Sequence, residues 1–238
     1  MAMDLNDNSY YQSIRFTPDG FCLYLNSDNN TELCKLAIKA DLSKDAVMDT
    51  QSAFQKAIHE IGFDTEKETK IIHKSDFFCC APRGVFDKED CINLLHFQNN
   101  NFNANEQMTL VEHLNQEKMD LFFSVDRDTY NFFNSTGIKH IDSCQISELI
   151  ADAIKHTEAV VACNITHTGC EVAAAQNKEL ILVNNYCAGN TEDIVYTILN
   201  IAQTVFDTNM SEVKFLVYNA NLEIKNFCLD KISNIQFK

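Results

Sequence analysis

The stretch that decides the fold is AVVACNITHTGCEVAAAQNKELILVNNYC, residues 159–187. Two apolar runs, 159–166 and 170–176, flank the short polar segment HTG, and a third apolar run covers 179–187. Apolar runs of this length, separated by polar turn residues, are typical of buried strands joined by tight turns. The stretch therefore predicts a three-stranded meander.

The same order of elements occurs earlier in the chain. SIRFT (13–17) and FCLYLN (21–26) flank the turn residues PDG, and LCKLAIKA (33–40) supplies a third strand. A helix with one apolar stripe follows at 47–61, just as a capped amphipathic helix at 190–207 follows the second meander. The chain thus presents the pattern of meander and helix twice.

The remaining elements are predicted from shorter patterns. Strands are expected at 70–82, 119–125, 138–143 and 212–220, and helices at 87–97, 126–135 and 147–156. The Asn-rich segment 98–107 is predicted to be a surface loop, and the last 18 residues are ambiguous. The duplication predicts an α/β protein with an N-terminal lobe, 8–156, and a shorter C-terminal lobe, 157–238, each a mixed sheet flanked by helices.

Composition limits the partners and the compartment. The 238 residues include 19 basic and 34 acidic side chains, a formal net charge of −15, so the surface repels nucleic acid and anionic lipid. No run has the ~18 consecutive apolar residues of a membrane span, and the first residues do not resemble a signal peptide. We expect a cytoplasmic protein that neither binds nucleic acid nor inserts into a membrane.

Ten cysteines and six glycines carry further information. The cysteines lie mostly in apolar runs, as buried free thiols do in a reducing compartment; those read as core residues are Cys22, Cys79, Cys80, Cys91, Cys163, Cys187 and Cys228. Loops that wrap phosphates need glycine for positive φ and close approach. No two glycines are adjacent or separated by one residue, so the chain has little material for such loops.

Two meander-containing lobes in one chain resemble the superfamily of actins, sugar kinases and heat-shock chaperones. More specifically, APRGVFDKED (81–90) and ELILVNNYCAGNTEDIVYTILN (179–200) resemble an uncharacterised bacterial family of that superfamily. The resemblance implies actin-like, or ribonuclease H-like, lobes in which each hairpin turn is a phosphate loop and ATP lies between the lobes. It brings no established activity.

The first phosphate loop and the adenosine segment of that superfamily are altered here. The first loop usually resembles I-D-x-G-T with an Asp that organises Mg²⁺, whereas IRFTP places Arg15 at the Asp and Thr17 at the Gly. A cation in place of the acid reverses the local charge. The adenosine segment, usually a strand followed by two glycines, corresponds to FLVYNAN, with Tyr218 and Asn219 in the turn.

The second phosphate loop is altered as well. It usually resembles D-I-G-G-G-T-T-D, whereas NITHTGCE places Asn164 at the first acid and side chains at the three glycines, namely Thr166, His167 and Thr168. Cβ atoms at these turn positions obstruct the cradle of backbone N–H groups that would hold a phosphate. ATP hydrolysis is therefore not expected.

The sequence favours a catalytically inactive actin-like protein that acts as a scaffold or interaction module for an unknown protein partner, without a cofactor. The alternative is a nucleotide-binding protein with atypical loops that holds ATP and Mg²⁺. Its vestigial contacts would be Asp19, Gly20, Thr166, His167, Thr168, Gly169 and Asn219. A third alternative is an enzyme with an unrecognised site, although no G-x-S-x-G, H-E-x-x-H or Walker signature is present.

Other candidate sites have simpler interpretations. Cys163, His167 and Cys170 offer three metal ligands but no fourth, so we favour two core thiols and a histidine on the turn, with residual anion binding as a second alternative. Asp126 and Asp128 follow a strand, where α/β proteins often place function, but they equally suit the first turn of a helix.

Overall fold

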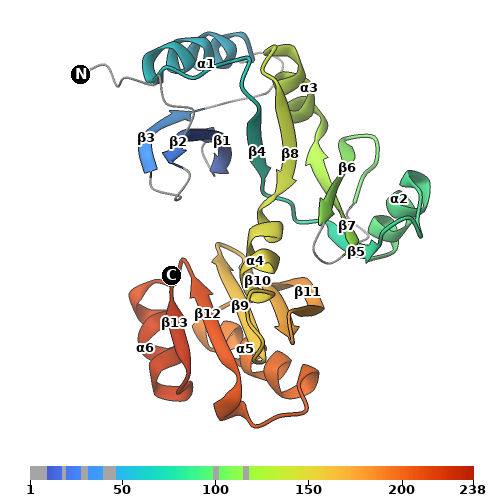
Figure 1. The fold of residues 1–238 in the computed structure, drawn as a ribbon, viewed down its shortest axis with the longest axis vertical. Helices are drawn as coiled ribbons and strands as arrows, with labels where there is room; N and C mark the ends of the chain where they lie inside the picture. Colours follow the sequence, from blue (N-terminus) through green and yellow to red (C-terminus); the bar gives the residue numbers. More distant parts are fainter. Residues whose placement is uncertain (1–9, 18–19, 28–31, 40–46, 99–101, 115–117) are drawn as a thin grey trace. The chain divides into compact units, whose positions relative to one another are not determined.

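The computed structural model describes the chain except residues 1–9, 18–19, 28–31, 40–46, 99–101 and 115–117 (Figure 1). Packing divides the chain into two units. Unit 1 comprises Met1–Phe77, Leu95–Glu112 and Phe123–Cys144, and unit 2 comprises Phe78–Leu94, His113–Phe122 and Gln145–Lys238. Each unit contains one five-stranded sheet. A domain boundary between residues 156 and 157 stays a prediction.

The sheet of unit 1 has the order β3-β2-β1-β4-β8. Its strands are β1 (Tyr10–Thr17), β2 (Gly20–Ser27), β3 (Glu32–Lys39), β4 (Thr69–His73) and β8 (His140–Cys144). The meander β1–β2–β3 is antiparallel, whereas β4 and β8 continue the sheet in parallel. The sheet is therefore mixed, as the sequence predicts.

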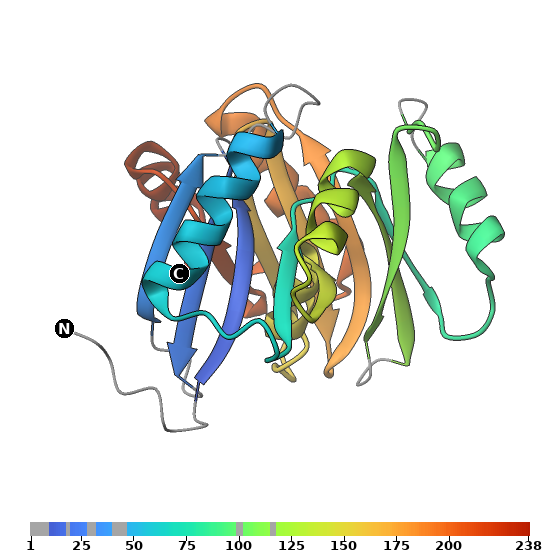
Figure 2. The same ribbon diagram turned by 90° about the horizontal axis from the view of Figure 1, so that it is seen from above.

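One face of this sheet is covered by α1 (Val47–Ile61) and α3 (Arg127–Ser135). Figure 2 shows α1 lying along the meander. The core between them is aromatic, because Phe21 packs edge-on against Phe54 and Phe133, with ring centroids 5.4 and 5.6 Å apart. All three rings are buried, which explains why the apolar stripe of α1 is needed.

The sheet of unit 2 repeats this topology with the order β11-β10-β9-β12-β13. Its strands are β9 (Val160–Thr166), β10 (Gly169–Gln176), β11 (Glu179–Cys187), β12 (Lys214–Tyr218) and β13 (Ile235–Phe237). Again the meander is antiparallel and the next two strands are parallel to β9 and β12. The predicted duplication is thus present as two matching sheets.

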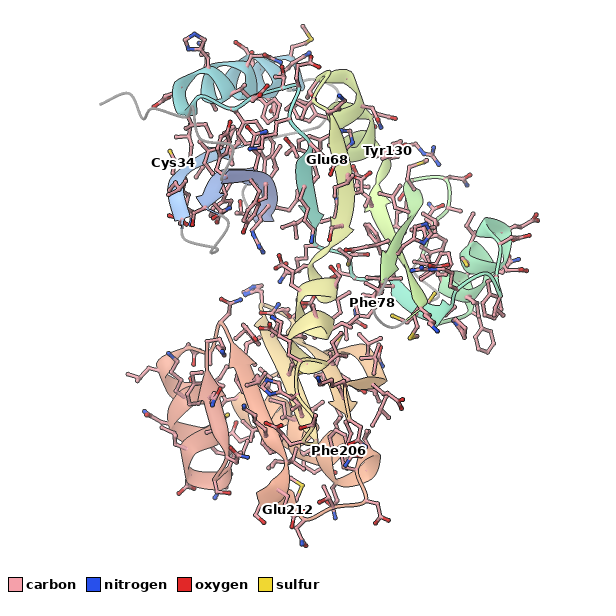
Figure 3. The ribbon with its side chains drawn as sticks, in the orientation of Figure 1. Cys34, Glu68, Phe78, Tyr130, Phe206 and Glu212 are labelled. Carbon is pink, nitrogen blue, oxygen red and sulfur yellow. The ribbon has the colours of Figure 1, made fainter. Side chains whose placement is uncertain are left out.

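Helices cover both faces of the second sheet. One face packs on α4 (Gln145–Ala153), and the other on α5 (Thr191–Val205) and α6 (Leu222–Lys231). Phe206, labelled in Figure 3, follows α5 and is buried in the core beneath these two helices. Asn190 caps α5 through its side chain, which accepts a hydrogen bond from the Asp193 backbone N–H.

The two meanders also share an irregularity in the third strand. The pairing register shifts by one residue at Leu33 in β3 and at Ile181 in β11, so each of these residues is a bulge. Both bulged residues are exposed, at 36% and 50%. A shared bulge at the corresponding strand indicates that the duplication extends beyond the order of the elements.

The segment between the meanders differs from the sequence prediction in two ways. Residues 70–82 form two strands, β4 and β5 (Phe78–Pro82), in different sheets. The chain turns between them because the Ser75 hydroxyl donates to the Phe77 carbonyl oxygen (2.8 Å). A strand that the sequence did not indicate, β6 (Gln107–Leu114), joins β5 and β7 (Met119–Asp126) in a three-stranded sheet, beside which the chain forms α2 (Lys88–Gln98).

The Asn-rich segment is more than a surface loop. Phe102 is only 2% exposed and packs edge-on against Phe77. Arg127 holds the end of the segment, because its guanidinium donates to the carbonyl oxygens of Ala104 and Asn105 (3.0 and 2.9 Å). The polar composition of the segment gave no sign of the buried Phe102 or of the hydrogen bonds from Arg127.

The C-terminal part and the cysteines complete the comparison. The ambiguous last 18 residues contain α6 and β13. The strand predicted at 212–220 is present as the shorter β12, and a short helix, η1 (Met210–Glu212), precedes it. All ten cysteines are free thiols and seven are buried, but Cys187 is exposed and Cys80 is half-buried, so those two are not core residues. No helix among the described residues is long and apolar enough to cross a membrane.

Candidate functional site

The turn between β9 and β10 is where the second phosphate loop would lie. Thr166 ends β9 and pairs with Gly169, which begins β10, so His167 and Thr168 form a two-residue turn. Both turn side chains are exposed, and neither residue has a positive φ. The turn closes the hairpin tightly and leaves no run of bare backbone N–H groups.

Gly169 is required by close packing between strands. Its φ is +152°, a conformation that L side chains rarely adopt. A Cβ atom at this position would lie 1.9 Å from the Tyr186 carbonyl oxygen and 2.9 Å from the Ala188 nitrogen. The backbone of β11 and the residue after it therefore approach Gly169 so closely that only glycine fits.

Three polar side chains, from β9, from β10 and from the residue after β12, form a chain of hydrogen bonds. Asn219 Nδ2 donates to Asn164 Oδ1 (2.8 Å), and Asn164 Nδ2 donates to Glu171 Oε2 (2.7 Å). Asn164 and Glu171 are 5% and 4% exposed, and they lie directly opposite each other in the pairing of β9 with β10. Asn164, which stands where the superfamily has its first acid, is therefore hydrogen-bonded to other side chains of the protein.

Asn219 and Tyr218, at the expected adenosine turn, also have internal roles. Asn219 has a left-handed φ of +57°, which asparagine tolerates better than most residues. The Tyr218 hydroxyl donates to Asp152 of α4, and burial together with this hydrogen bond raises the pKa of Tyr218. Burial tends to raise the pKa of Asp152, but hydrogen bonds from Lys155 and Tyr218 outweigh it, so that pKa lies below its ordinary value.

The first hairpin contributes fewer observations. Gly20 begins β2 and pairs with Thr17, while Asp19 lies outside the described residues. Arg15 stands within β1, opposite Cys22 on β2 and Ile72 on β4. Arg15 stands where the superfamily has its Mg²⁺-organising Asp, so β1 carries a positive guanidinium at that position.

A polar pair also joins the last residue of β4 to the middle of β8 in unit 1. His73 Nε2 is 2.7 Å from Asp142 Oδ1, and the imidazole stacks on Phe16 with ring centroids 5.1 Å apart. His73 is only 2% exposed. This pair ties β4 to β8.

The remaining sequence candidates have structural roles. Asp126 caps α3, because its carboxylate accepts from the Thr129 backbone N–H (2.9 Å). His96 is exposed and packs edge-on against Phe102. His167 lies on the turn, whereas Cys163 and Cys170 are buried in the core. Within the part of the chain that the structure describes, no three His, Cys, Asp or Glu side chains gather as ligands of one metal ion.

The structure brings together Thr166, His167, Thr168 and Gly169 in one turn and Asn219 with Asn164 beside it. Sequence reasoning missed Glu171 and Asp152. A single acid within the apolar run CEVAAAQ was the available signal for Glu171, because a charged side chain in a buried strand needs a partner. No signal in the sequence connects Asp152 with Tyr218.

The fold defines the class of protein. The structure is similar to a Bacteroides thetaiotaomicron protein with an actin-like ATPase fold and unknown function, with a TM-score of 0.76, 18% identity, and coverage of 99% of this chain and 93% of that chain. It is also similar to the PilM–PilN type IV pilus biogenesis complex, with a TM-score of 0.56, 6% identity, and coverage of 96% of this chain and 88% of that chain. A third similar structure is the ethanolamine utilization protein EutJ from Carboxydothermus hydrogenoformans, with a TM-score of 0.51, 8% identity, and coverage of 100% of this chain and 87% of that chain. The chain therefore has the actin-like ATPase fold.

The family is shown by the sequence itself. Residues 3–226 match the family described as "Protein of unknown function (DUF3822)", and the chain belongs to it. No curated protein matches the chain. The family and the fold agree with the resemblance drawn from 81–90 and 179–200.

Proposed function

We propose that this protein is a catalytically inactive actin-like protein that serves as a scaffold or interaction module in the bacterial cytoplasm. The observation that carries the proposal is the hydrogen-bond chain from Asn219 through Asn164 to Glu171. It engages the polar side chains at the strand ends where a nucleotide-binding relative would present groups to Mg²⁺ and phosphate. Groups bonded to one another are less available to a ligand.

The backbone of the second hairpin supports the same proposal. The turn holds side chains at His167 and Thr168, and the space beside Gly169 is filled by the backbone of Tyr186. A phosphate needs several converging N–H groups at a concave backbone. The hairpin has neither the length nor the glycine content for such a cradle.

Two observations support an interaction role. PilM, one of the proteins in a structure similar to this one, is found there in a complex with PilN. Several large apolar side chains of this chain are exposed, including Phe97 (86%), Leu222 (74%) and Tyr196 (70%), as residues at protein-binding surfaces often are. The ten free thiols fit a reducing compartment such as the cytoplasm.

The test is a calorimetric titration of the purified protein with Mg-ATP and with Mg-ADP, with an ATP-hydrolysing actin-like protein as positive control. The proposal expects no saturable heat. Binding tighter than about 100 μM, or about −5.5 kcal/mol, would overturn it in favour of the nucleotide-binding alternative. That alternative also predicts that Asn219→Ala weakens binding, whereas Asn226→Ala, an exposed asparagine on α6, serves as the matched control.

The interaction role needs its own measurement. Proximity labelling with the tagged protein in its native host should mark one protein reproducibly, and the purified pair should then co-elute at stoichiometric ratio. A chain that elutes alone with every marked protein would contradict the scaffold role without affecting the conclusion about nucleotides.

A further inference from the structure

Cys163 and Cys170 form a buried thiol pair inside the β9–β10 hairpin. Cys163 lies opposite Val172 and Cys170 opposite Ile165, so the two cysteines are diagonal neighbours on adjacent strands. Both belong to the core beneath α5 and α6 and are 0% and 1% exposed. The two thiols therefore lie on the same face of the hairpin and in the same core.

We propose that Cys163 and Cys170 are an oxidation-sensitive dithiol, which a low-molecular-weight disulfide converts reversibly into an intramolecular disulfide. Diagonal neighbours in an antiparallel pair lie about 7–8 Å apart, beyond the Cα separation of about 4.4–6.8 Å that a disulfide usually spans, so the bond requires the two strands to move toward each other. The bond would staple the hairpin on both sides of the Thr166–Gly169 turn. This inference does not depend on the proposed function.

The chemistry is ordinary thiol–disulfide exchange. The Cys170 thiolate attacks one sulfur of the external disulfide, and a mixed disulfide forms while the first external thiolate leaves. The Cys163 thiolate then attacks the Cys170 sulfur, and the second external thiolate leaves. The two protein thiols lose two protons and two electrons in total, and the external disulfide becomes two thiols.

The electrostatics assign the two roles. The hydrogen bond from Cys163 lowers the pKa of Cys170 and outweighs the effect of burial, whereas burial and the same bond raise the pKa of Cys163. Cys170 therefore loses its proton first and is the attacking thiol, with Cys163 as the resolving thiol. Cys170 follows the turn directly, so opening of the hairpin end would expose it before Cys163.

The chain contains its own controls. Cys79 and Cys91 are also buried and interact electrostatically, but burial raises their pKa values to about 12 and about 11, and neither is lowered. We expect this second pair to stay reduced. Exposed Cys187 would form an unproductive mixed disulfide, so Cys187→Ser is the background for the experiment.

The experiment treats the folded full-length Cys187→Ser protein with oxidised glutathione. The protein is then denatured, alkylated and mapped by mass spectrometry. The expected result is the loss of two alkylatable thiols and a Cys163–Cys170 linked peptide, both reversed by dithiothreitol. In the same background, Cys163→Ala should accumulate a glutathione adduct on Cys170, and Cys170→Ala should leave Cys163 reduced.

Three results would overturn the proposal: every thiol stays alkylatable in the treated protein, the linked peptide contains Cys228, or Cys79 and Cys91 are linked instead. Circular dichroism checks that the alanine variants are folded. If either alanine variant does not fold, the proposal is tested by the linked peptide of the Cys187→Ser protein alone. A glutathione adduct on Cys163 in the Cys170→Ala variant would overturn the assignment of the two roles.

Discussion

Replacing Gly169 by alanine should destabilise unit 2 severely, because two separate costs add at this position. The new Cβ atom would lie 1.9 Å from the Tyr186 carbonyl oxygen, less than any real contact, so the backbone of the hairpin or of β11 must shift. Overpacking of this kind costs about 1–3 kcal/mol. The φ of +152° adds about 1–3 kcal/mol of strain for any residue with a Cβ.

The sum, about 2–6 kcal/mol, is a large part of the stability of a typical domain. The assay is urea denaturation followed by circular dichroism, together with hydrogen exchange to assign the transition to unit 2. With an m-value of about 2.5 kcal/mol/M, the midpoint of that transition should fall by roughly 1–2 M. The two units can unfold separately, so each transition is fitted by itself.

Gly84→Ala is the matched control, because Gly84 also lies in unit 2 and has a positive φ of +74°. Nothing lies within 4 Å of a Cβ atom there, so the expected cost is only the conformational one, about 1 kcal/mol. If Gly169→Ala and Gly84→Ala cost the same, close approach of β11 is not the reason for Gly169. The glycine would then have to be explained by the function of the turn.

Three further predictions follow from single contacts. Asn164→Asp, which restores the superfamily's acid, should destabilise unit 2 by about 2–4 kcal/mol in urea at pH 7, because the new carboxylate would face Glu171; a stability equal to that of the parent would contradict the geometry. Burial tends to raise the pKa of Asp120, but hydrogen bonds from His113 and Arg83 outweigh this effect and lower the pKa below its ordinary value. Asp120 therefore stabilises the fold at pH values above its unfolded pKa of about 3.9. This contribution is lost as the pH falls through the lower pKa of the folded state. Asp120→Asn should therefore lower the free energy of unfolding by about 1–2 kcal/mol at pH 7 and by less at pH 3. The effect is modest because both partners, His113 and Arg83, are partly exposed. A difference between the two proteins that does not change with pH would refute this account. Asp126→Ala should cost about 1 kcal/mol in thermal unfolding of unit 1 through loss of the α3 cap, whereas Asp128→Ala, two residues later in the first turn of α3, should cost much less.

Local patterns predicted the meanders and long helices well because each carries its own signal. The polar turns and the apolar runs of 159–187 reproduce β9, β10 and β11 almost residue for residue. The helix at 47–61 matches α1, whose single apolar stripe faces an aromatic core. In these elements the periodicity and the burial agree, so propensity and tertiary packing point to the same structure.

The misses occur where long-range contacts decide. Lys74–Phe77 break one apolar run into two strands because Ser75 bonds locally, and the two halves then join different sheets. The Asn-rich segment lies against the fold because Arg127, more than 20 residues later, holds its carbonyl groups. The bonds of Asn219 and Tyr218 likewise reach partners about 55 and 66 residues away, beyond any local pattern.

The loss of the second phosphate signature cannot be reversed by restoring one acid. Asn164 and Glu171 face each other across the hairpin, and the amide of Asn164 donates a hydrogen bond to the buried carboxylate of Glu171. An aspartate at 164 would place two carboxylates about 3 Å apart in a poorly solvated site, where both cannot ionise. A return to the superfamily's pattern would therefore require at least two compensating changes, at 164 and 171, besides glycines in the turn. The polar network of Asn164, Glu171 and Asn219 thus couples these positions, so a change at one of them affects the other two.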